Sequence, residues 1–246
     1  RCLAVERRRM VKPVAPAPAI LIPGLLSDAH VWREVQPAFD GDVHIPDLRT
    51  AGSIQAMVDG ALSCSQASEI VLIGHSMGAR VAMEAARQAP QRVKKLVLIS
   101  TGSHPLAPNE RAKRQAITAL SREKGIEALA AHWLPGMVWA GNLSRPGLMD
   151  GLTAMVCRMD PSIHARQIQA LIDRPDARSY LSELQQETLL LVGREDRWSP
   201  VSQHSDMANR LPHAQLHIIE EAGHFLPLEQ GGKTAQALRQ FLSPHG

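Results

Sequence analysis

The sequence predicts an α/β fold: a doubly wound, mostly parallel sheet that carries an inserted helical cap. Short runs that are apolar throughout alternate with segments of helical spacing, as expected when parallel strands are buried on both faces. This alternation stops over residues 103–186, where only helical patterns occur, and then resumes. The middle segment is most simply a cap over the carboxyl edge of the sheet, where such folds bind ligands.

Residues 1–18 form a basic and proline-rich lead-in. Residues 1–12 contain five Lys or Arg residues and one Glu, and the rest of the chain has a net charge close to zero. A basic tail can bind nucleic acid or a membrane, but we favour a solvated terminus. Prolines at positions 13, 16 and 18 keep this segment out of helices and central strands.

The first half of the chain contains four predicted strands and two predicted helices. The strand-like runs are Ala19–Ile22, Val43–Pro46, Glu69–Ile73 and Lys95–Ser100, and the helices are Ser53–Ser63, with Ser53 as its cap, and Met77–Ala89.

The second half begins with the cap and ends with two further strand–helix pairs. Helical patterns cover Arg111–Arg122, Gly125–Leu134 and Ser162–Ile172; after them come a strand at Thr188–Val192, a helix at Pro200–Leu211, a strand at Gln215–Ile219 and a helix at Lys233–Leu242. We therefore assign residues 19–102 and 187–246 to the core and 103–186 to the cap.

Composition excludes several classes of protein. With 246 residues, 44% of them apolar and 21% charged, the chain suits a globular domain with a sizeable core. No apolar run approaches the roughly 18–20 residues of a membrane span, so no membrane partner is expected. Three Phe, four Trp and one Tyr offer little for stacking on nucleic acid, which is not expected as a partner either. The three widely spaced cysteines favour a reducing, cytoplasmic setting.

The most informative motif is Gly74-His75-Ser76-Met77-Gly78, which lies between an apolar strand and a helix. A sharp strand-to-helix turn leaves no room for side chains beside the serine, which explains the flanking glycines. The turn projects the hydroxyl above the sheet, at a helix N-terminus that favours developing negative charge. The pattern therefore indicates a nucleophilic Ser76.

A serine nucleophile needs a base, and the base needs an orienting acid. Asp196 follows one late strand and His224 follows the next, so both should reach the sheet edge that holds Ser76. Glu195 is the second choice for the acid. His75 is interpreted as structural. No zinc-ligand spacing, dinucleotide motif or P-loop occurs, so neither a metal nor another cofactor is implied.

The chain resembles the α/β-hydrolase fold family from Ala19 to its C-terminus. The matching motifs are Ile22-Pro23-Gly24-Leu25, Gly74-His75-Ser76-Met77-Gly78, Gly193-Arg194-Glu195-Asp196 and Ala222-Gly223-His224-Phe225. From Arg174-Pro175-Asp176 onward the chain is similar to the serine carboxylesterase and lactonase branch of BioH-like esterases. The resemblance implies that Ser76 is the nucleophile, His224 the general base and acid, and Asp196 its orienter. It also implies an oxyanion hole formed by the amides of Leu25 and Met77.

Two departures from the family pattern matter. Pro23-Gly24 stands where many members have His-Gly, and this change removes no catalytic donor because the expected donor is the amide of Leu25. The short segment before the first strand leaves little room for the family's usual edge hairpin, so we expect six or seven strands rather than eight.

The expected function is cleavage of a small or medium carboxylic ester, thioester or lactone through an acyl-enzyme. A C–C bond hydrolase or an acyltransferase with the same triad is the alternative, and a non-catalytic receptor or scaffold of the same fold is a further one. Leu25, Trp133, Met137 and Trp139 are candidate substrate contacts. Met149, Met155 and Met159 follow in the cap and, together with that cluster, suggest an apolar, adaptable pocket for the acyl group. The expected partner is a small acyl substrate. Arg111, Lys113 and Arg114 could meet an acidic acyl carrier protein, although a solvated helix face is the preferred interpretation. A monomer and a homodimer are both open.

Overall fold

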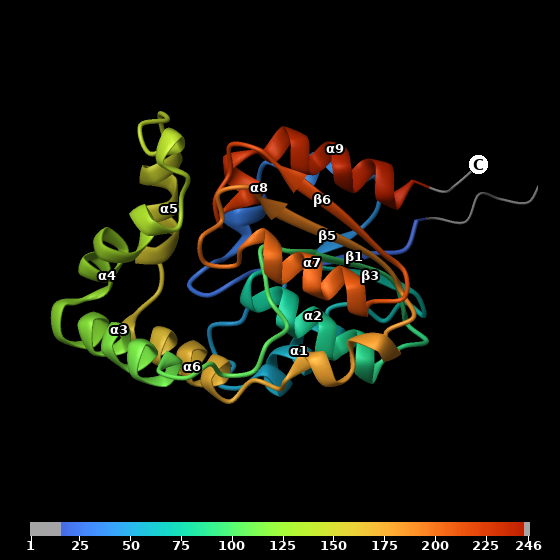
Figure 1. Ribbon diagram of the computed structural model, residues 1–246, viewed down its shortest axis with the longest axis horizontal. Helices are drawn as coiled ribbons and strands as arrows, with labels where there is room; N and C mark the ends of the chain where they lie inside the picture. The colour runs from blue at the N-terminus through green and yellow to red at the C-terminus, as the bar shows by residue number, and fades with distance from the viewer. Residues whose placement is uncertain (1–15, 244–246) are drawn as a thin grey trace, which may run out of the picture.

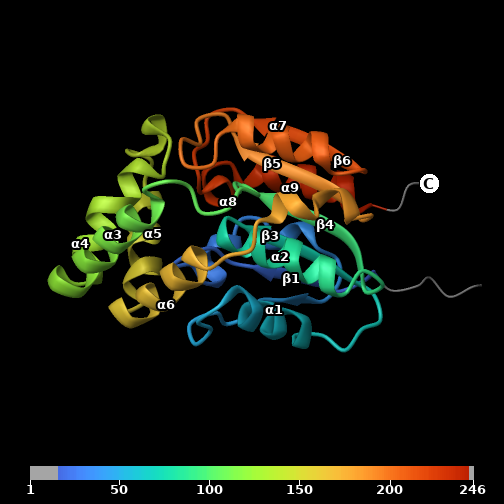
Figure 2. The same cartoon turned by 60° about the horizontal axis from the view of Figure 1, so that its bottom comes forward.

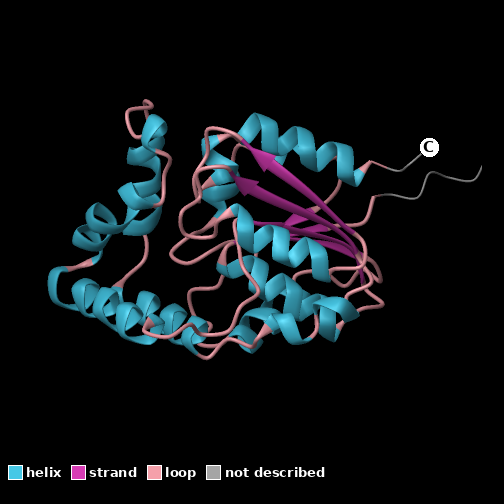
Figure 3. Cartoon of the chain, in the orientation of Figure 1, coloured by secondary structure: helices cyan, strands magenta, loops and turns pink. Residues whose placement is uncertain are grey.

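The computed structural model describes residues 16–243 and contains one six-stranded sheet in which every pair of neighbours is parallel (Figure 3). The strands are β1 (Ala19–Ile22), β2 (Val43–His44), β3 (Ile70–His75), β4 (Val93–Ile99), β5 (Glu187–Gly193) and β6 (Ala214–Ile219). Their order is β2-β1-β3-β4-β5-β6. The predicted α/β class and the expected strand number are confirmed for this part of the chain. Of the predicted basic lead-in (residues 1–18), only residues 16–18 belong to the described part.

Helices cover both faces of the sheet, as Figure 1 shows. They are α1 (Ile54–Ser63), α2 (Met77–Gln88), α3 (Glu110–Lys124), α4 (Ile126–Trp133), α5 (Leu148–Cys157), α6 (Pro161–Ile172), α7 (Val201–Arg210), α8 (Leu226–Glu229) and α9 (Gly231–Leu242). The predicted cap of α1 is present, since the Ser53 hydroxyl accepts a hydrogen bond from the Ala56 amide.

Alternate side chains of each strand pack into two separate apolar cores, one on each face of the sheet. Ile20 and Leu72 are fully buried against α1, α2 and α7, whereas Leu21 and Ile73 are fully buried against α8 and α9. Strands buried on both faces must be apolar at every position, which is why they read as continuous runs in the sequence.

Between β4 and β5 the chain forms the helices α3 to α6 (residues 110–172), which lie within the predicted cap of residues 103–186. Figure 2 shows them grouped at one end of the sheet, and the strand arrows in Figure 3 point toward that end. Helix α5 was not predicted. Its apolar residues have helical spacing and are buried, but the methionine Met155 among them was interpreted as part of a pocket; it packs inside the cap instead.

The strand order creates a switch point beside β1. The chain runs from β1 outward to β2 and then returns to β3 on the other side of β1. Loops that leave neighbouring strands in opposite directions open a crevice at the carboxyl edge. The segments after β1 and β3 meet there, and these are the segments that contain Leu25 and Ser76. Within residues 16–243, no helix has the length and apolar character needed to cross a membrane.

Candidate active site

Ser76 lies in a strained turn directly between β3 and α2. Its backbone has φ 54° and ψ −113°, a region that a residue with a side chain rarely adopts. A Cβ atom at Gly74 would collide with the start of α2, and one at Gly78 would collide with the carbonyl of Ile22. The two glycines are therefore required by the close approach of backbone to backbone, as the motif predicts.

The structure brings the three predicted catalytic residues into one hydrogen-bonded chain. The Nε2 atom of His224 lies 2.8 Å from the Oγ atom of Ser76, and its Nδ1 atom lies 2.9 Å from Oδ2 of Asp196. The side chains of Asp196 and His224 are almost completely buried, whereas Ser76 is partly exposed to the cavity above it. This arrangement allows His224 to take the serine proton while Asp196 holds the imidazole in place.

Asp196 is held in its charged form. Its second oxygen, Oδ1, accepts hydrogen bonds from the amides of Trp198 at 2.9 Å and Ser199 at 2.8 Å. Burial would raise the pKa of Asp196, but the attraction and hydrogen bond of His224 and the hydrogen bond from the Ser199 amide lower the pKa below its usual value. The neighbouring Glu195 turns elsewhere and accepts from the amide of Ala222. Asp196, rather than Glu195, therefore reaches His224.

The two predicted oxyanion donors flank the serine. Met77 is the first residue of α2, and Leu25 follows β1. Within residues 16–243 neither amide donates to a protein acceptor, so both are free for a ligand oxygen. The residue after Leu25, Leu26, has a positive φ of 54°, and its amide donates to Oε1 of the buried Gln167 in α6 at 2.9 Å. A cap side chain thus fixes the loop that carries one donor.

The loop around His224 is anchored from several directions. The His224 amide donates to the carbonyl of Met137, at 2.7 Å, and the His224 carbonyl accepts from Nε2 of His75 at 2.8 Å. Burial and the nearby His224 lower the pKa of His75 to about 3, so His75 is neutral and acts as a fixed donor. The carboxylate of Glu229, 1% exposed, accepts from the amides of Gly223 and Phe225 on either side of His224.

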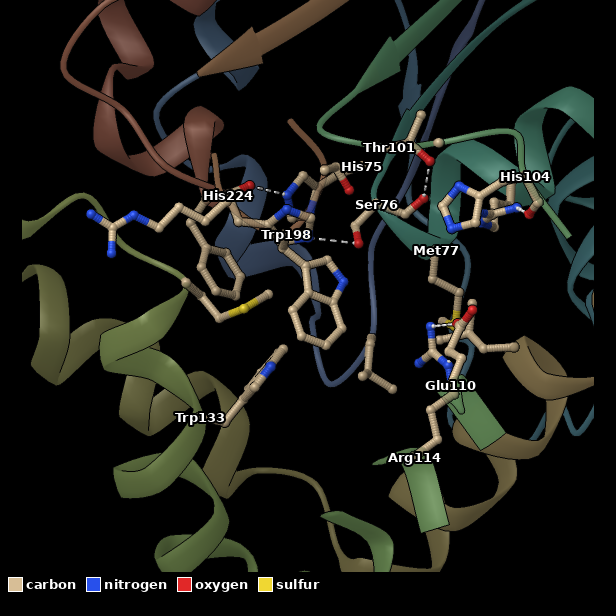
Figure 4. A pocket seen from close by; sticks show the side chains of 18 of the residues that line it. His75, Ser76, Met77, Thr101, His104, Glu110, Arg114, Trp133, Trp198 and His224 are labelled. Atoms are coloured by element: carbon tan, nitrogen blue, oxygen red, sulfur yellow. Dashed lines mark hydrogen bonds and ion pairs between the residues drawn. The ribbon is translucent and has the colours of Figure 1, made fainter. Parts of the chain in front are cut away.

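A cavity of about 250 Å³ opens over Ser76. In Figure 4, Trp133 and Trp198 lie on the His224 side of Ser76, whereas His104, Glu110 and Arg114 lie beyond Met77. The two tryptophans and the pair Glu110 and Arg114 thus lie on different sides of the cavity.

Three of the four candidate substrate contacts line this cavity: Leu25, Trp133 and Met137. The structure does not bring Trp139 to it. The ring of Trp139 packs over Gly141, and its amide donates to Glu229. The short helical turn Leu134–Gly136 separates the two tryptophans, and only Trp133 lines the cavity.

Sequence reasoning did not identify Gln167, Glu229 or Arg80 as site residues. Gln167 lies 141 positions from its partner Leu26, and no local pattern signals such a contact. Glu229 follows His224 by five residues within a short helix, so the one available signal was a carboxylate in an otherwise apolar segment. Arg80 occupies the first turn after the nucleophile and was interpreted simply as part of α2.

This fold and site define a class of enzymes in which a strand-to-helix turn presents a nucleophile beneath a helical cap. A model of the family with the alpha/beta hydrolase fold matches residues 18–230, and the chain belongs to that family.

One relative by sequence and two solved structures support the same assignment. A 2-hydroxymuconate semialdehyde hydrolase of Pseudomonas sp. (strain CF600) is 23% identical over 96% of this chain and 80% of its own length. Among solved structures, a malate-bound thermophilic esterase from Thermogutta terrifontis is 26% identical with a TM-score of 0.84, covering 93% of this chain and 90% of that one. An enol-lactonase from Burkholderia xenovorans LB400 has a TM-score of 0.84 at 19% identity, over 95% and 94%, and shows the shared fold. The protein is a hydrolase of this fold.

Proposed function

We propose that the protein hydrolyses carboxylic esters, thioesters or lactones through a covalent acyl-enzyme on Ser76. The observation that carries this proposal is the 2.8 Å contact between Ser76 Oγ and His224 Nε2, next to two amides free to bind an oxyanion. The similarity to an esterase at 26% identity agrees with it.

The reaction follows from the positions of these groups. Ser76 Oγ attacks the acyl carbonyl carbon as His224 takes the hydroxyl proton, and the carbonyl oxygen becomes an oxyanion held by the Leu25 and Met77 amides. When the carbon–oxygen or carbon–sulfur bond to the leaving group breaks, His224 delivers the proton to that group. A water molecule then gives its proton to His224 and attacks the acyl carbon, which releases the acid and restores Ser76.

Cleavage of a carbon–carbon bond is a second candidate. The similarity to a 2-hydroxymuconate semialdehyde hydrolase over 96% of the chain favours it. The two reactions differ in the leaving group, since a carbon leaving group must receive its proton on carbon. A protein limited to esters therefore needs only the His224 proton, whereas a C–C hydrolase must also stabilise a carbanion equivalent.

The test combines labelling with a choice of substrates. A fluorophosphonate should add one phosphonyl group to the native protein, and peptide mass spectrometry should locate it on Ser76, with heat-denatured protein as the control. Turnover is then compared between 4-nitrophenyl esters of graded acyl length and 2-hydroxymuconate semialdehyde. Faster turnover of the semialdehyde would favour the second candidate. A failure to label Ser76 together with no ester turnover would overturn the proposal.

A further inference from the structure

The cavity over Ser76 is lined by more cations than carboxylates. One carboxylate, Glu110, and four cationic side chains line the cavity over Ser76: Arg80, Lys113, Arg114 and Arg197. The pocket therefore has a net positive charge next to the candidate nucleophile. Fields of this kind, inside walls of low dielectric, attract anions.

Glu110 offsets only one of these four cations, Arg114, and both of its oxygens are occupied. The buried Arg174 binds it through two parallel contacts, Nη1 to Oε1 and Nη2 to Oε2, each of 2.8 Å. Arg114 adds a third contact from Nε to Oε1 at 2.8 Å. These contacts tie the start of α3 to the segment after α6, so the role of Glu110 is structural. Burial would raise the pKa of Glu110, but these arginines and the amide of Ala107 lower the pKa to about 2.

Arg80 remains without an acidic partner within residues 16–243. Its side chain makes one hydrogen bond to protein there, from Nη1 to the carbonyl oxygen of His104 at 3.1 Å. A guanidinium has five N–H donors in a planar fork, so most of the fork is unused. The side chain is partly exposed and lines the cavity that contains Ser76.

The surroundings of Arg80 disfavour a lone cation. Burial, followed by repulsion from Arg174 and Arg114, lowers the pKa of Arg80 to about 9. The guanidinium still carries its charge at neutral pH. A cation held in a partly desolvated site beside like charges is stabilised when an anion binds to it in a planar, two-pronged contact.

The position of Arg80 relates it to the scissile bond. The Arg80 amide donates to the Ser76 carbonyl at 3.4 Å, so the two residues are one turn apart at the start of α2. One turn corresponds to roughly 5.4 Å along the helix axis. Both side chains line the same cavity of about 250 Å³. An anionic group that binds Arg80 while its carbonyl carbon lies at Ser76 must therefore be joined to that carbon by a short chain.

We propose that Arg80 binds a carboxylate of the substrate. The preferred substrates are then acyl compounds with a free carboxylate a few bonds from the scissile carbonyl. Monoesters of short dicarboxylic acids are an example. The catalytic part of this inference rests on the proposed function. The binding part does not, because a dicarboxylate can occupy the cavity whether or not the serine reacts.

The first test measures binding without catalysis. Glutarate should raise the melting temperature of the native protein, and uncharged glutaramide of the same length should not. Arg80→Gln should weaken glutarate binding about 10- to 100-fold, as expected for the loss of hydrogen bonds to a charged group. Arg122→Gln is the matched control, since it removes the same charge from an exposed position on α3. Equal effects of glutarate and glutaramide on the native protein would overturn the proposal without any variant.

The second test measures selectivity. The 4-nitrophenyl monoester of glutaric acid and 4-nitrophenyl valerate have acyl chains of five carbons, and only the first carries a carboxylate. Arg80→Gln should lower the ratio of their kcat/KM values at least tenfold, while Arg80→Lys, which keeps the charge but loses the planar fork, should lower it less. An unchanged ratio in Arg80→Gln would overturn the proposal even if both esters are cleaved. No cleavage of either ester by the native protein, together with glutarate binding that depends on Arg80, would count against the proposed function alone.

Discussion

The carboxyl edge of the sheet and the cap both contribute to the candidate site, but they are built in different ways. At the sheet edge, each candidate catalytic residue follows the end of a strand and is fixed by nearby backbone. The Ser76 amide, for example, donates to the carbonyl of Ile99 on the adjacent strand at 2.8 Å. The cap reaches the site through side chains that contact residues far away in sequence, such as Gln167 with Leu26.

This difference separates chemistry from selectivity. Groups that must keep one geometry for every substrate lie on strand ends, where sheet hydrogen bonds and glycine contacts leave little freedom. Groups that contact the variable part of a substrate lie on helices held by a few polar contacts. Mutations at the strand ends should therefore affect all substrates alike, whereas mutations on the helices should act selectively or by smaller factors.

The largest effect is expected from Ser76→Ala. Loss of a triad nucleophile lowers kcat by about 10⁶, leaving only the contributions of the oxyanion hole and of binding. The reduction should be the same for short and long esters, measured by release of 4-nitrophenol. Circular dichroism should show an unchanged fold. Residual turnover within tenfold of the native rate would mean that another residue is the nucleophile.

A smaller but still uniform loss is expected from Asp196→Asn. The amide leaves the geometry in place but favours the wrong tautomer of His224, a change that lowers kcat by about 10⁴ in a serine triad. Glu195→Gln is the matched control at the adjacent position, where the carboxylate binds the Ala222 amide. Equal losses in the two variants would contradict the assignment of Asp196 as the orienting acid.

The contrast between the two regions also explains what the sequence could predict. Ser76, Asp196 and His224 were accessible because strand-end position and residue type are local properties. Helix α5 was missed although its apolar spacing was visible, because apolar residues of a cap were assigned to a pocket. The roles of Gln167 and Arg80 depend on which distant side chains approach them, and no local pattern carries that information.

Acid should destabilise the protein through histidines buried in the neutral form. Burial is the main cause that lowers the pKa of His75 to about 3 and the pKa values of His164 and His204 to about 4. The unfolded chain, with pKa values near 6.5, binds more protons than the native state in this range, so stability is complete above about pH 6.5 and falls as the pH drops toward 4. Each histidine should contribute a slope of about 1.4 kcal/mol per pH unit.

Urea unfolding at pH 7.5 and at pH 5 measures this loss, which should exceed about 2 kcal/mol. His164 belongs to the cap, where its Nδ1 atom lies 2.7 Å from the Ser121 hydroxyl. His164→Gln should therefore remove one histidine's share of the slope and leave the share of the two core histidines. A slope that does not differ between the variant and the native protein would show that His164 does not titrate on unfolding.

Gln167→Leu tests whether the cap also supports the chemistry. Without the acceptor for the Leu26 amide, the loop that carries the Leu25 donor should shift, so we expect kcat to fall about tenfold with little change in KM. Gln167→Glu keeps an acceptor and should lose less. Gln169→Leu, on the exposed side of the same helix, is the control. A rise in KM at constant kcat would mean that Gln167 affects substrate binding rather than the oxyanion.

The smallest and most selective effect is expected from Trp133→Ala. Trp133 lines the cavity, is 9% exposed and packs edge-on against Phe225. Loss of ~60 Å² of apolar contact with an acyl chain costs roughly 1.5 kcal/mol, or about tenfold in kcat/KM. The loss should grow with acyl length and be small for acetate esters, because a short acyl group does not reach the cap.

Trp139→Ala is the matched control for that prediction, since Trp139 lies in the same segment but outside the cavity. It should lower kcat/KM by a similar, small factor for every acyl length, because the lost ring packs over Gly141 and the backbone amide that donates to Glu229 is kept. A length dependence in both variants would mean that the cap moves to place Trp139 against the substrate. Equal losses for all esters in Trp133→Ala would mean that Trp133 supports the cap instead of contacting the acyl chain.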